Sequence, residues 1–548
     1  MPDLTGIPVS PGKAAGPAYR LAEPAPMPEP RAVTDREAEL AQALAALRAV
    51  ADDLTRRAEA TTDRTAADVL NAQVMILGDP VLAEAVDTEV AAGRDAPHAI
   101  SAVLAAYRAG FVAAGGYLAE RAADLDDLRD RAVAVCLGRP MPGVPAPGVP
   151  FVLFARDLAP ADTATLDPAQ VLAVVTEEGG PTSHTAIVAR SLGLPAVVRC
   201  PGIRDIADGT PVRVDGTAGA VTIGVDETTV AATTAAERAR RAALAASTGP
   251  GRTADGHPVA LLANIGSARD LADPGAPVAE GVGLFRTELL YLDRAVAPSL
   301  DEQSATYTEV FRVAAGRRVV VRTLDAGADK PLPFLPARRE PNPALGVRGL
   351  RLAHLDPSML DTQLTAIAKA AAETDADVWV MAPMVATVDE ASRFVRRCRA
   401  AGLRHAGVMV EIPAAALRAR ALLDVVDFLS IGTNDLSQYA FAADRECGEL
   451  ATLLDPWQPA LLDLVGVCGA AGAAAGKPVG LCGEAAADPL LAPVLVGLGV
   501  TSLSMSARSL PAVRAALATR TLADCRALAA AARAAGDPEA ARAAVTGG

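Results

Sequence analysis

Residues 406–434 read AGVMVEIPAAALRARALLDVVDFLSIGTN, in which two short apolar runs flank a helix-like segment. The runs AGVMVEI (406–412) and FLSIGTN (428–434) have the length and composition of buried strands. The stretch between them is rich in alanine and leucine and is long enough for one helix. A strand–helix–strand unit of this kind is typical of a parallel sheet, because parallel neighbours need a crossover connection.

The same unit recurs through the C-terminal half of the chain, where each strand-like run is followed by a loop and a helix-like segment. The eight runs are VALLANI (259–265), GVGLFR (281–286), VVVRTLD (319–325), VWVMAPM (378–384), AGVMVEI (406–412), FLSIGTN (428–434), PVGLCGE (478–484) and SLSMS (502–506). Eight repeats predict a (β/α)8 barrel over residues 257–548, and therefore an α/β protein.

The N-terminal half of the chain is organised differently. Residues 1–30 contain short strands and turns, and residues 141–225 alternate strands with helices. Between them, residues 31–140 show a helical pattern that starts at Thr34 and Glu37, spaced as a capping box. We predict a small α/β domain made of the two outer segments, an all-helical bundle inserted into it, and a helical linker over residues 226–256.

Composition narrows the class of function. The chain has 548 residues and a formal net charge of −14, which disfavours a nucleic-acid partner or an anionic membrane surface. No run of eighteen apolar residues and no recognisable leader at Met1 occur, so we expect a cytoplasmic protein without membrane insertion. The seven cysteines are scattered without a C-x-x-C pair, so neither a zinc site nor a disulfide framework is indicated.

Charged residues gather at the predicted carboxyl ends of the barrel strands, where barrels of this class place their active sites. The strand ends carry Arg286, Arg322 with Asp325, Glu411, Asn434 with Asp435, and Cys482 with Glu484, and the adjoining loops carry Lys330, Arg348 and Arg445. Arginine grips carboxylate or phosphate with two parallel bonds, and two carboxylates suit Mg²⁺. The pattern predicts a site for an anionic phosphate ester bound with magnesium, with solvent-facing charges as the alternative. Cys482 is either a small core residue or a proton donor to a substrate carbanion.

A second motif, GGPTSHTAIVAR (179–190), places one of the five histidines at the predicted start of a helix. Gly179 and Gly180 allow the backbone to approach a ligand closely, and a helix N-terminus offers free N–H groups to a phosphate. His184 is therefore a candidate phosphoryl acceptor. A structural or capping histidine is the alternative, and the neighbouring residues alone leave both open.

Taken together, these motifs resemble the PEP-utilising enzymes, where PEP is phosphoenolpyruvate. GGPTSHTAIVAR is similar to the phosphohistidine signature of that family, and the threonine after His184 resembles enzyme I of the PEP:sugar phosphotransferase system. The resemblance covers nearly the whole chain in the family's order, through TGIPVSPGKAAGPAYRL (5–21), GVGLFRTELLYLDR (281–294), RTLDAGADKPLPF (322–334), NPALGVRGLR (342–351), FLSIGTNDLSQYAFAADR (428–445) and GLCGE (480–484).

The resemblance implies a reaction and a role for each motif residue. PEP would bind the barrel with Mg²⁺, and His184 would attack its phosphorus to give phosphohistidine and pyruvate enolate. The phosphoryl group would then pass to the carrier protein HPr, docked on the helical domain. The implied PEP ligands are Arg286, Arg322, Lys330, Arg348, Asn434 and Arg445. The implied magnesium ligands are Glu411 and Asp435, the enolate would be protonated by Cys482, and His184 would be supported by Thr163, Gly179 and Gly180.

The resemblance further implies a homodimer through the barrel domain and a swivelling histidine domain. One segment departs from the family pattern: in NAQVMILGDP (71–80), Gln73 and Gly78 replace a histidine and an acid. A PEP-utilising dikinase or synthase that uses ATP is a rival, but a chain of 548 residues leaves no room for its nucleotide-binding domain. A regulatory protein without catalysis is a second rival, and it should lack part of the site, whereas every implied chemical residue is present.

Overall fold

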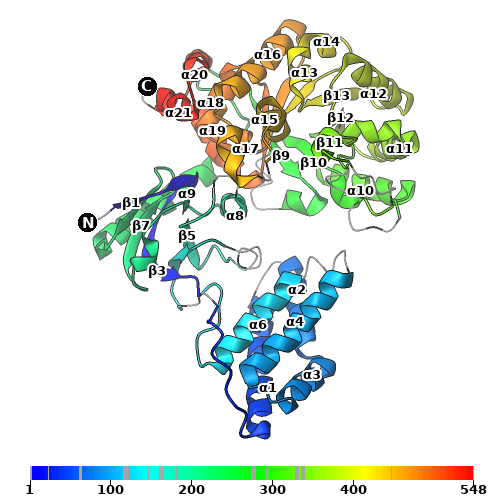
Figure 1. Ribbon diagram of the computed structural model, residues 1–548. Helices are drawn as coiled ribbons and strands as arrows, with labels where there is room; N and C mark the ends of the chain where they lie inside the picture. Colours follow the sequence, from blue (N-terminus) through cyan, green and yellow to red (C-terminus); the bar gives the residue numbers. More distant parts are fainter. Residues whose placement is uncertain are drawn as a thin grey trace. The chain divides into compact units, whose positions relative to one another are not determined.

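Eight parallel strands close into a barrel in the C-terminal half of the chain, in the order β10-β11-β12-β13-β14-β15-β16-β9. Figure 1 shows this half of the chain in green to red, with helices around the strands. The structure is a computed structural model that describes residues 3–22, 24–60, 64–114, 122–145, 147–158, 162, 166–180, 183–272, 279–291, 294, 296–327, 332–334, 340–445 and 447–546. The barrel strands are β9 (Ala260–Ile265), β10 (Gly281–Arg286), β11 (Arg318–Arg322), β12 (Asp377–Ala382), β13 (His405–Val410), β14 (Leu429–Gly432), β15 (Val479–Cys482) and β16 (Ser502–Met505). Each overlaps one of the eight strand-like runs, so the predicted α/β fold with its barrel is confirmed.

Helices surround the barrel, and side chains alternate between two cores along each strand. On β11, Val319 and Val321 belong to the large core between strands and helices, whereas Val320 joins Met381 and Met409 in the barrel interior. The surrounding helices are α10 (Leu300–Val313), α11 (Pro357–Ala372), α12 (Val388–Ala400), α13 (Pro413–Leu417), α14 (Ala419–Leu423), α15 (Thr433–Phe441), α16 (Pro459–Ala475), α17 (Glu484–Ala487), α18 (Leu491–Gly497), α19 (Leu510–Ala518), α20 (Leu522–Ala534) and α21 (Pro538–Thr546).

One segment of the described residues, Leu450–Ala475, is long and apolar enough to cross a membrane by length and composition. It includes α16, whose residues Leu461, Leu462 and Val465 belong to the core that surrounds the barrel strands. Packing against the barrel therefore accounts for the apolar residues on the buried side of α16.

In the N-terminal half, three strands from residues 3–20 and five strands from residues 151–223 form one mixed sheet. Their order in the sheet is β1-β8-β7-β3-β4-β5-β6-β2. The strands are β1 (Asp3–Thr5), β2 (Ile7–Ser10), β3 (Lys13–Arg20), β4 (Phe151–Ala155), β5 (Val171–Thr176), β6 (Ala196–Val198), β7 (Pro211–Asp215) and β8 (Ala220–Ile223). Both faces are covered: Val174 of β5 belongs to one core and Val175 to the other. Helix α8 (His184–Leu192) packs on the first of these faces through Ala186 and Ala189.

Between β3 and β4 the chain forms a helical bundle with its own core, in which Val50, Leu82 and Ile100 are fully buried. The bundle helices are α1 (Arg36–Ala60), α2 (Arg64–Leu77), α3 (Pro80–Ala91), α4 (Ala96–Ala114) and α6 (Ala122–Cys136). The predicted capping box of Thr34 and Glu37 is wrong. Asp35 precedes the first helical residue, and its carboxylate accepts the N–H of Ala38 at 3.0 Å, which is the geometry of an N-cap.

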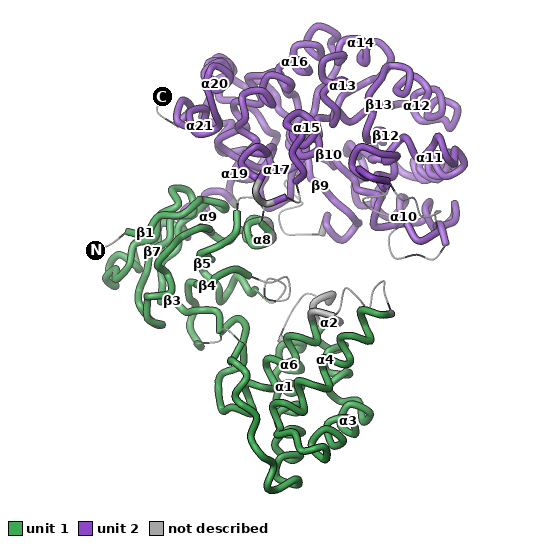
Figure 2. Tube along the Cα trace, viewed as in Figure 1, with its two compact units in different colours: residues 1–237 green, residues 238–548 purple. Residues whose placement is uncertain are grey.

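The chain divides into two compact units, residues 1–237 and residues 238–548 (Figure 2). Helix α9 (Glu227–Ala246) contains the division point between them. The finer domain boundaries drawn from the sequence remain predictions.

Candidate active site

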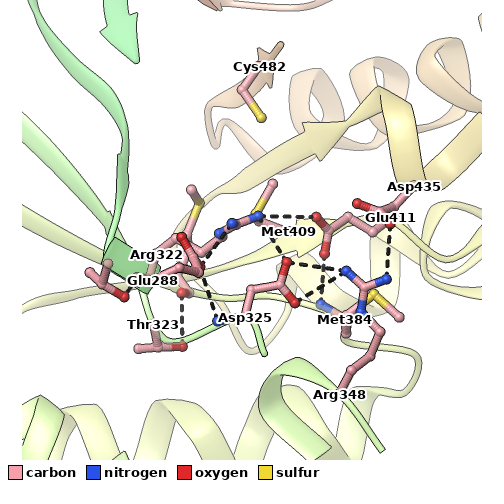
Figure 3. A network of polar contacts seen from close by, with 12 residues as sticks. Glu288, Arg322, Thr323, Asp325, Arg348, Met384, Met409, Glu411, Asp435 and Cys482 are labelled. Carbon is pink, nitrogen blue, oxygen red and sulfur yellow. Dashed lines mark hydrogen bonds and ion pairs between the residues drawn. The ribbon is translucent and has the colours of Figure 1, made fainter. Parts of the chain in front are cut away.

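Arg322, the last residue of β11, lies at the centre of a polar network at the carboxyl end of the barrel (Figure 3). Its guanidinium donates to Glu288 Oε1 at 2.9 Å and lies 3.3 Å from Asp325 Oδ2 and 3.8 Å from Glu411 Oε1. Burial disfavours its charge, but the three carboxylates outweigh burial and raise the pKa of Arg322. Arg322 is therefore a fixed cation whose position is set from three sides.

Arg348 is the second buried cation of the network, with a relative exposure of 1%. Nη2 contacts both oxygens of Asp325 at 3.3 and 3.4 Å, and Nη1 contacts Asp435 Oδ1 at 3.3 Å. The same nitrogen lies 3.4 Å from the hydroxyl of Tyr439. Asp325 consequently bridges the two arginines, and the planar fork of Arg348 joins two carboxylates from different strand ends.

Glu411 follows β13 and is almost completely buried, with Oε2 accepting the backbone N–H of Met384 at 2.8 Å. Burial, together with Asp325 and Asp435, raises the pKa of Glu411 to about 8. Burial and the two neighbouring carboxylates therefore disfavour the ionised form of Glu411, and a divalent cation between these side chains would favour it. No group of three or more His, Cys, Asp or Glu side chains forms a ready-made metal site among the described residues. Mg²⁺ fits this donor set, because it takes few protein carboxylates and completes its coordination with substrate and water.

Cys482 ends β15 with its side chain in the barrel interior, and its thiol donates to the carbonyl oxygen of Ile431 at 3.5 Å. Burial and the nearby Glu411 raise the pKa of Cys482 to about 11. The thiol is therefore protonated at neutral pH. A proton donor must carry its proton, whereas a nucleophilic cysteine acts as the thiolate, so this pKa favours the role of proton donor.

The remaining predicted ligands of the barrel are more exposed. Arg286 pairs in register with Arg322 on the neighbouring strand, and its side chain is solvent-exposed. Asn434 is exposed in the first turn of α15. Arg445 is half-buried, 3.9 Å from Asp435, and its backbone N–H donates to Gln438. Lys330 lies outside the described residues.

His184 is the first residue of α8, as the sequence predicts, and Ser183 is the N-cap, with its hydroxyl accepting the N–H of Ala186. Gly179 has φ +94°, a conformation that L side chains rarely adopt, and its carbonyl accepts from Arg199 at 3.1 Å. Gly180 accepts the N–H of Ser183 through its carbonyl oxygen at 3.0 Å. These bonds fix the backbone just before the first turn of α8. Thr163 lies outside the described residues.

Two residues of the network were not among the predicted site residues. Glu288 accepts both the guanidinium of Arg322 and the N–H of Asp325, and Tyr439 contacts Arg348. Glu288 follows Arg286 by two residues, so its position next to a strand-end arginine could have marked it as a residue of the site. In the bundle, Gln73 is buried, whereas Gly78 is exposed near the end of α2.

Comparison with known proteins first gives the class. Three domain families of PEP-utilising enzymes match the chain: the N-terminal family at residues 5–121, the mobile domain at 148–219 and the PEP-binding domain at 240–522. These matches define a PEP-utilising enzyme.

Full-length relatives then give the particular family. The chain is 55% identical to the phosphoenolpyruvate-protein phosphotransferase of Streptomyces coelicolor over 98% of both chains. It is 41% identical to the protein of the same name in Haloferax volcanii over 96% of both. A solved structure of Enzyme I is 31% identical and covers 43% of this chain and 99% of that chain, at a TM-score of 0.37. The chain belongs to the phosphoenolpyruvate-protein phosphotransferases, which confirms the family that the motifs predicted.

Proposed function

We propose that this chain transfers the phosphoryl group of PEP to its own His184 and then to a histidine of the phosphocarrier protein HPr. Pyruvate is the other product, and the reaction is the first step of sugar uptake by the phosphotransferase system. The observation that carries the proposal is the barrel mouth, where Arg322 and Arg348 lie buried among four carboxylates close to a protonated thiol. The names of the relatives support the same reaction.

Substrate binding is assigned to the cations of the barrel mouth. PEP carries its phosphate and its carboxylate on the same carbon, and arginine binds each of these groups through two parallel N–H bonds. Arg322 and Arg348 are held in place before substrate arrives, which lowers the cost of ordering them on binding. The exposed Arg286, Asn434 and half-buried Arg445 complete the proposed PEP site, together with Lys330.

The metal ligands in this proposal are Glu411 and Asp435. Mg²⁺ would neutralise the charge of these carboxylates and of the PEP phosphate when it is bound. Burial and the acidic neighbours Asp325 and Asp435 raise the pKa of Glu411, and this supports the assignment because a bound cation would stabilise the ionised carboxylate.

The chemical steps are assigned to His184 and Cys482. A ring nitrogen of His184 forms a bond to the phosphorus of PEP while the bond between phosphorus and the enol oxygen breaks, leaving pyruvate enolate. Cys482 then delivers its thiol proton to the methylene carbon of the enolate, giving pyruvate. The free N–H groups at the start of α8 stabilise the new phosphate on His184. Because His184 belongs to the first unit and the PEP site to the second, His184 must reach the barrel mouth during transfer.

The partner and the setting follow from the same proposal. HPr would take the phosphoryl group while docked on the helical bundle, the barrel would form the homodimer interface, and the enzyme would work in the cytoplasm. Burial of Gln73 argues that this residue acts inside the bundle rather than at the HPr interface.

The test is to incubate the purified protein with Mg²⁺ and PEP that is labelled on phosphorus. We expect acid-labile, base-stable label on the wild-type chain and none on His184→Ala. Addition of purified HPr should then remove the label from the chain. Label that appears only when ATP supplies the phosphate would overturn the proposal in favour of an ATP-using relative.

A further inference from the structure

Gln363 lies on α11, outside the barrel, with a relative exposure of 1%, and its side-chain amide makes three hydrogen bonds. Oε1 accepts the backbone N–H of Leu324 at 3.0 Å. Nε2 donates to Thr287 Oγ1 at 3.1 Å and to the hydroxyl of Tyr307 at 3.0 Å. Both the nitrogen and the oxygen of the amide are therefore hydrogen-bonded, and their partners lie outside the polar cluster at the barrel mouth.

The orientation of this amide is fixed by its surroundings. The backbone N–H of Leu324 can only donate, so the atom that faces it must be the amide oxygen. The amide nitrogen then faces two hydroxyl oxygens, both of which can accept. The hydroxyl of Thr287 donates a hydrogen bond to the backbone carbonyl oxygen of Arg322 at 2.9 Å.

The partners of Gln363 are the backbone segments that carry the arginines and acids of the site. Thr287 directly follows Arg286 at the end of β10. Leu324 lies between Arg322 and Asp325, after the end of β11. One side chain on an outer helix thus joins two neighbouring strand ends, and Thr287 extends the connection to Arg322 itself.

We infer that Gln363 is a positioning residue for PEP binding: it fixes the strand ends that carry Arg286, Arg322 and Asp325 in the geometry that the substrate requires. The inference rests on the proposed function, since it names a further residue of the same site. Catalytic groups must be held to within a fraction of an ångström, and supporting hydrogen bonds supply that precision.

Loss of the amide has a specific consequence for this geometry. Without the oxygen of Gln363, the N–H of Leu324 is left buried without its partner, and the turn from Arg322 to Asp325 moves to satisfy it. Asp325 bridges Arg322 and Arg348, so a shift of this turn displaces both arginines.

The experiment compares Gln363→Met, which keeps the length of the side chain and removes its hydrogen bonds, with Gln303→Met. Gln303 is a matched control because it is a buried glutamine on the neighbouring helix α10. It bonds to Tyr291 and to the carbonyl of Pro298. Tyr291 in turn contacts the hydroxyl of Tyr307, so Gln303→Met disturbs the Tyr307 side of the network and leaves the bonds of Gln363 to Thr287 and Leu324 in place. We expect Gln363→Met to lower the kcat/KM of His184 labelling by PEP about ten- to a hundredfold, mainly through KM. Gln303→Met should lose comparable thermal stability and keep the wild-type KM.

A second readout is independent of activity. Amide hydrogen exchange in the peptide that covers Arg322–Gly327 should accelerate in Gln363→Met and stay at the wild-type rate in Gln303→Met. Equal KM values in the two variants, or unchanged exchange at Leu324, would overturn the positioning role. Failure of the wild-type chain to take label from PEP would instead overturn the proposed function, so the two outcomes are distinguishable.

Discussion

Cys482 is a buried thiol at the end of β15, and its substitution separates substrate binding from proton transfer. The thiol contributes a proton in the proposed reaction, whereas the arginines bind PEP. We expect Cys482→Ala to slow the formation of pyruvate by about 10²- to 10⁴-fold, which is the usual contribution of a general acid. The half-saturating PEP concentration should change little. A coupled assay that consumes pyruvate measures both quantities.

Cys468→Ala is the matched control for this variant, because Cys468 is equally buried but lies on the outer helix α16. Its activity should equal that of the wild-type enzyme. A Cys482→Ala enzyme that forms pyruvate at the wild-type rate would remove Cys482 from the mechanism.

Arg348 joins Asp325 and Asp435 in the interior. Its removal leaves Asp325 with Arg322 as its cation, and Asp435 with the half-buried Arg445 at 3.9 Å. We expect Arg348→Ala to lower the free energy of unfolding of the barrel by about 3–5 kcal/mol, which is typical of a broken buried ion pair. Urea unfolding followed by tryptophan fluorescence measures the change. Arg397→Ala, which removes an exposed ion pair with Asp361 on the same barrel, should cost at most about 1 kcal/mol. If the two variants lose the same free energy of unfolding, the ion pairs of Arg348 contribute no more to stability than an exposed ion pair does.

For single residues, the sequence shows where along a strand a charged side chain lies but not how deeply that side chain is buried. Arg286 and Arg322 both end apolar runs, and the same pattern predicts both, yet one is exposed and the other is buried. The difference arises because Glu288, Asp325 and Glu411 converge on Arg322 from separate segments. Gln363 could not be recognised for the same reason: its three partners are 39, 56 and 76 residues away in the chain.

Among the elements, helix α10 begins with a capping box in which Ser299 and Glu302 bond to each other's backbone N–H. Arg294 and Ser299 hold the pKa of Glu302 at about 2, below its usual value of 4.5. Because the folded-state pKa is lowered, the stabilisation from Glu302 is complete above about pH 4.5 and is lost as the pH falls toward 2.

We therefore expect the amides of the first turn of α10 to lose protection as the pH falls through this range in the wild-type protein. In Glu302→Gln the protection should be lower at neutral pH and nearly independent of pH. Hydrogen exchange measured at several pH values checks this, with Glu309→Gln, an exposed glutamate of the same helix, as control. A wild-type pH dependence in Glu302→Gln would assign the effect to another group.

Strands were easy to predict where both faces of the strand are buried, and harder to predict where one face is exposed. Most barrel strands are apolar on both faces, because helices cover the outside and side chains fill the inside, so they appear as continuous apolar runs. β16, which reads SLSM, alternates serine with apolar residues. β7 reads PVRVD, with alternating exposed and buried residues and a leading proline, so it lacks the continuous apolar run that marks a strand buried on both faces. The start of α1 was misplaced by one residue because Thr34 and Asp35 are both good N-caps, and only the hydrogen bond to Ala38 decides between them.

For the whole molecule, both tryptophans, Trp379 and Trp457, belong to the unit of residues 238–548, and so do all the proposed PEP ligands. Tryptophan fluorescence therefore reports the unfolding of this unit alone, whereas far-ultraviolet circular dichroism reports both units. A ligand that binds only the folded barrel stabilises it by about 2.7 kcal/mol at a hundred times its Kd. With His184→Ala, which cannot turn PEP over, we expect PEP and Mg²⁺ to raise the midpoint of the fluorescence transition. The circular dichroism transition that belongs to residues 1–237 should not move. If both transitions shift together, the ligand engages both units, and a PEP site built by the barrel alone is wrong.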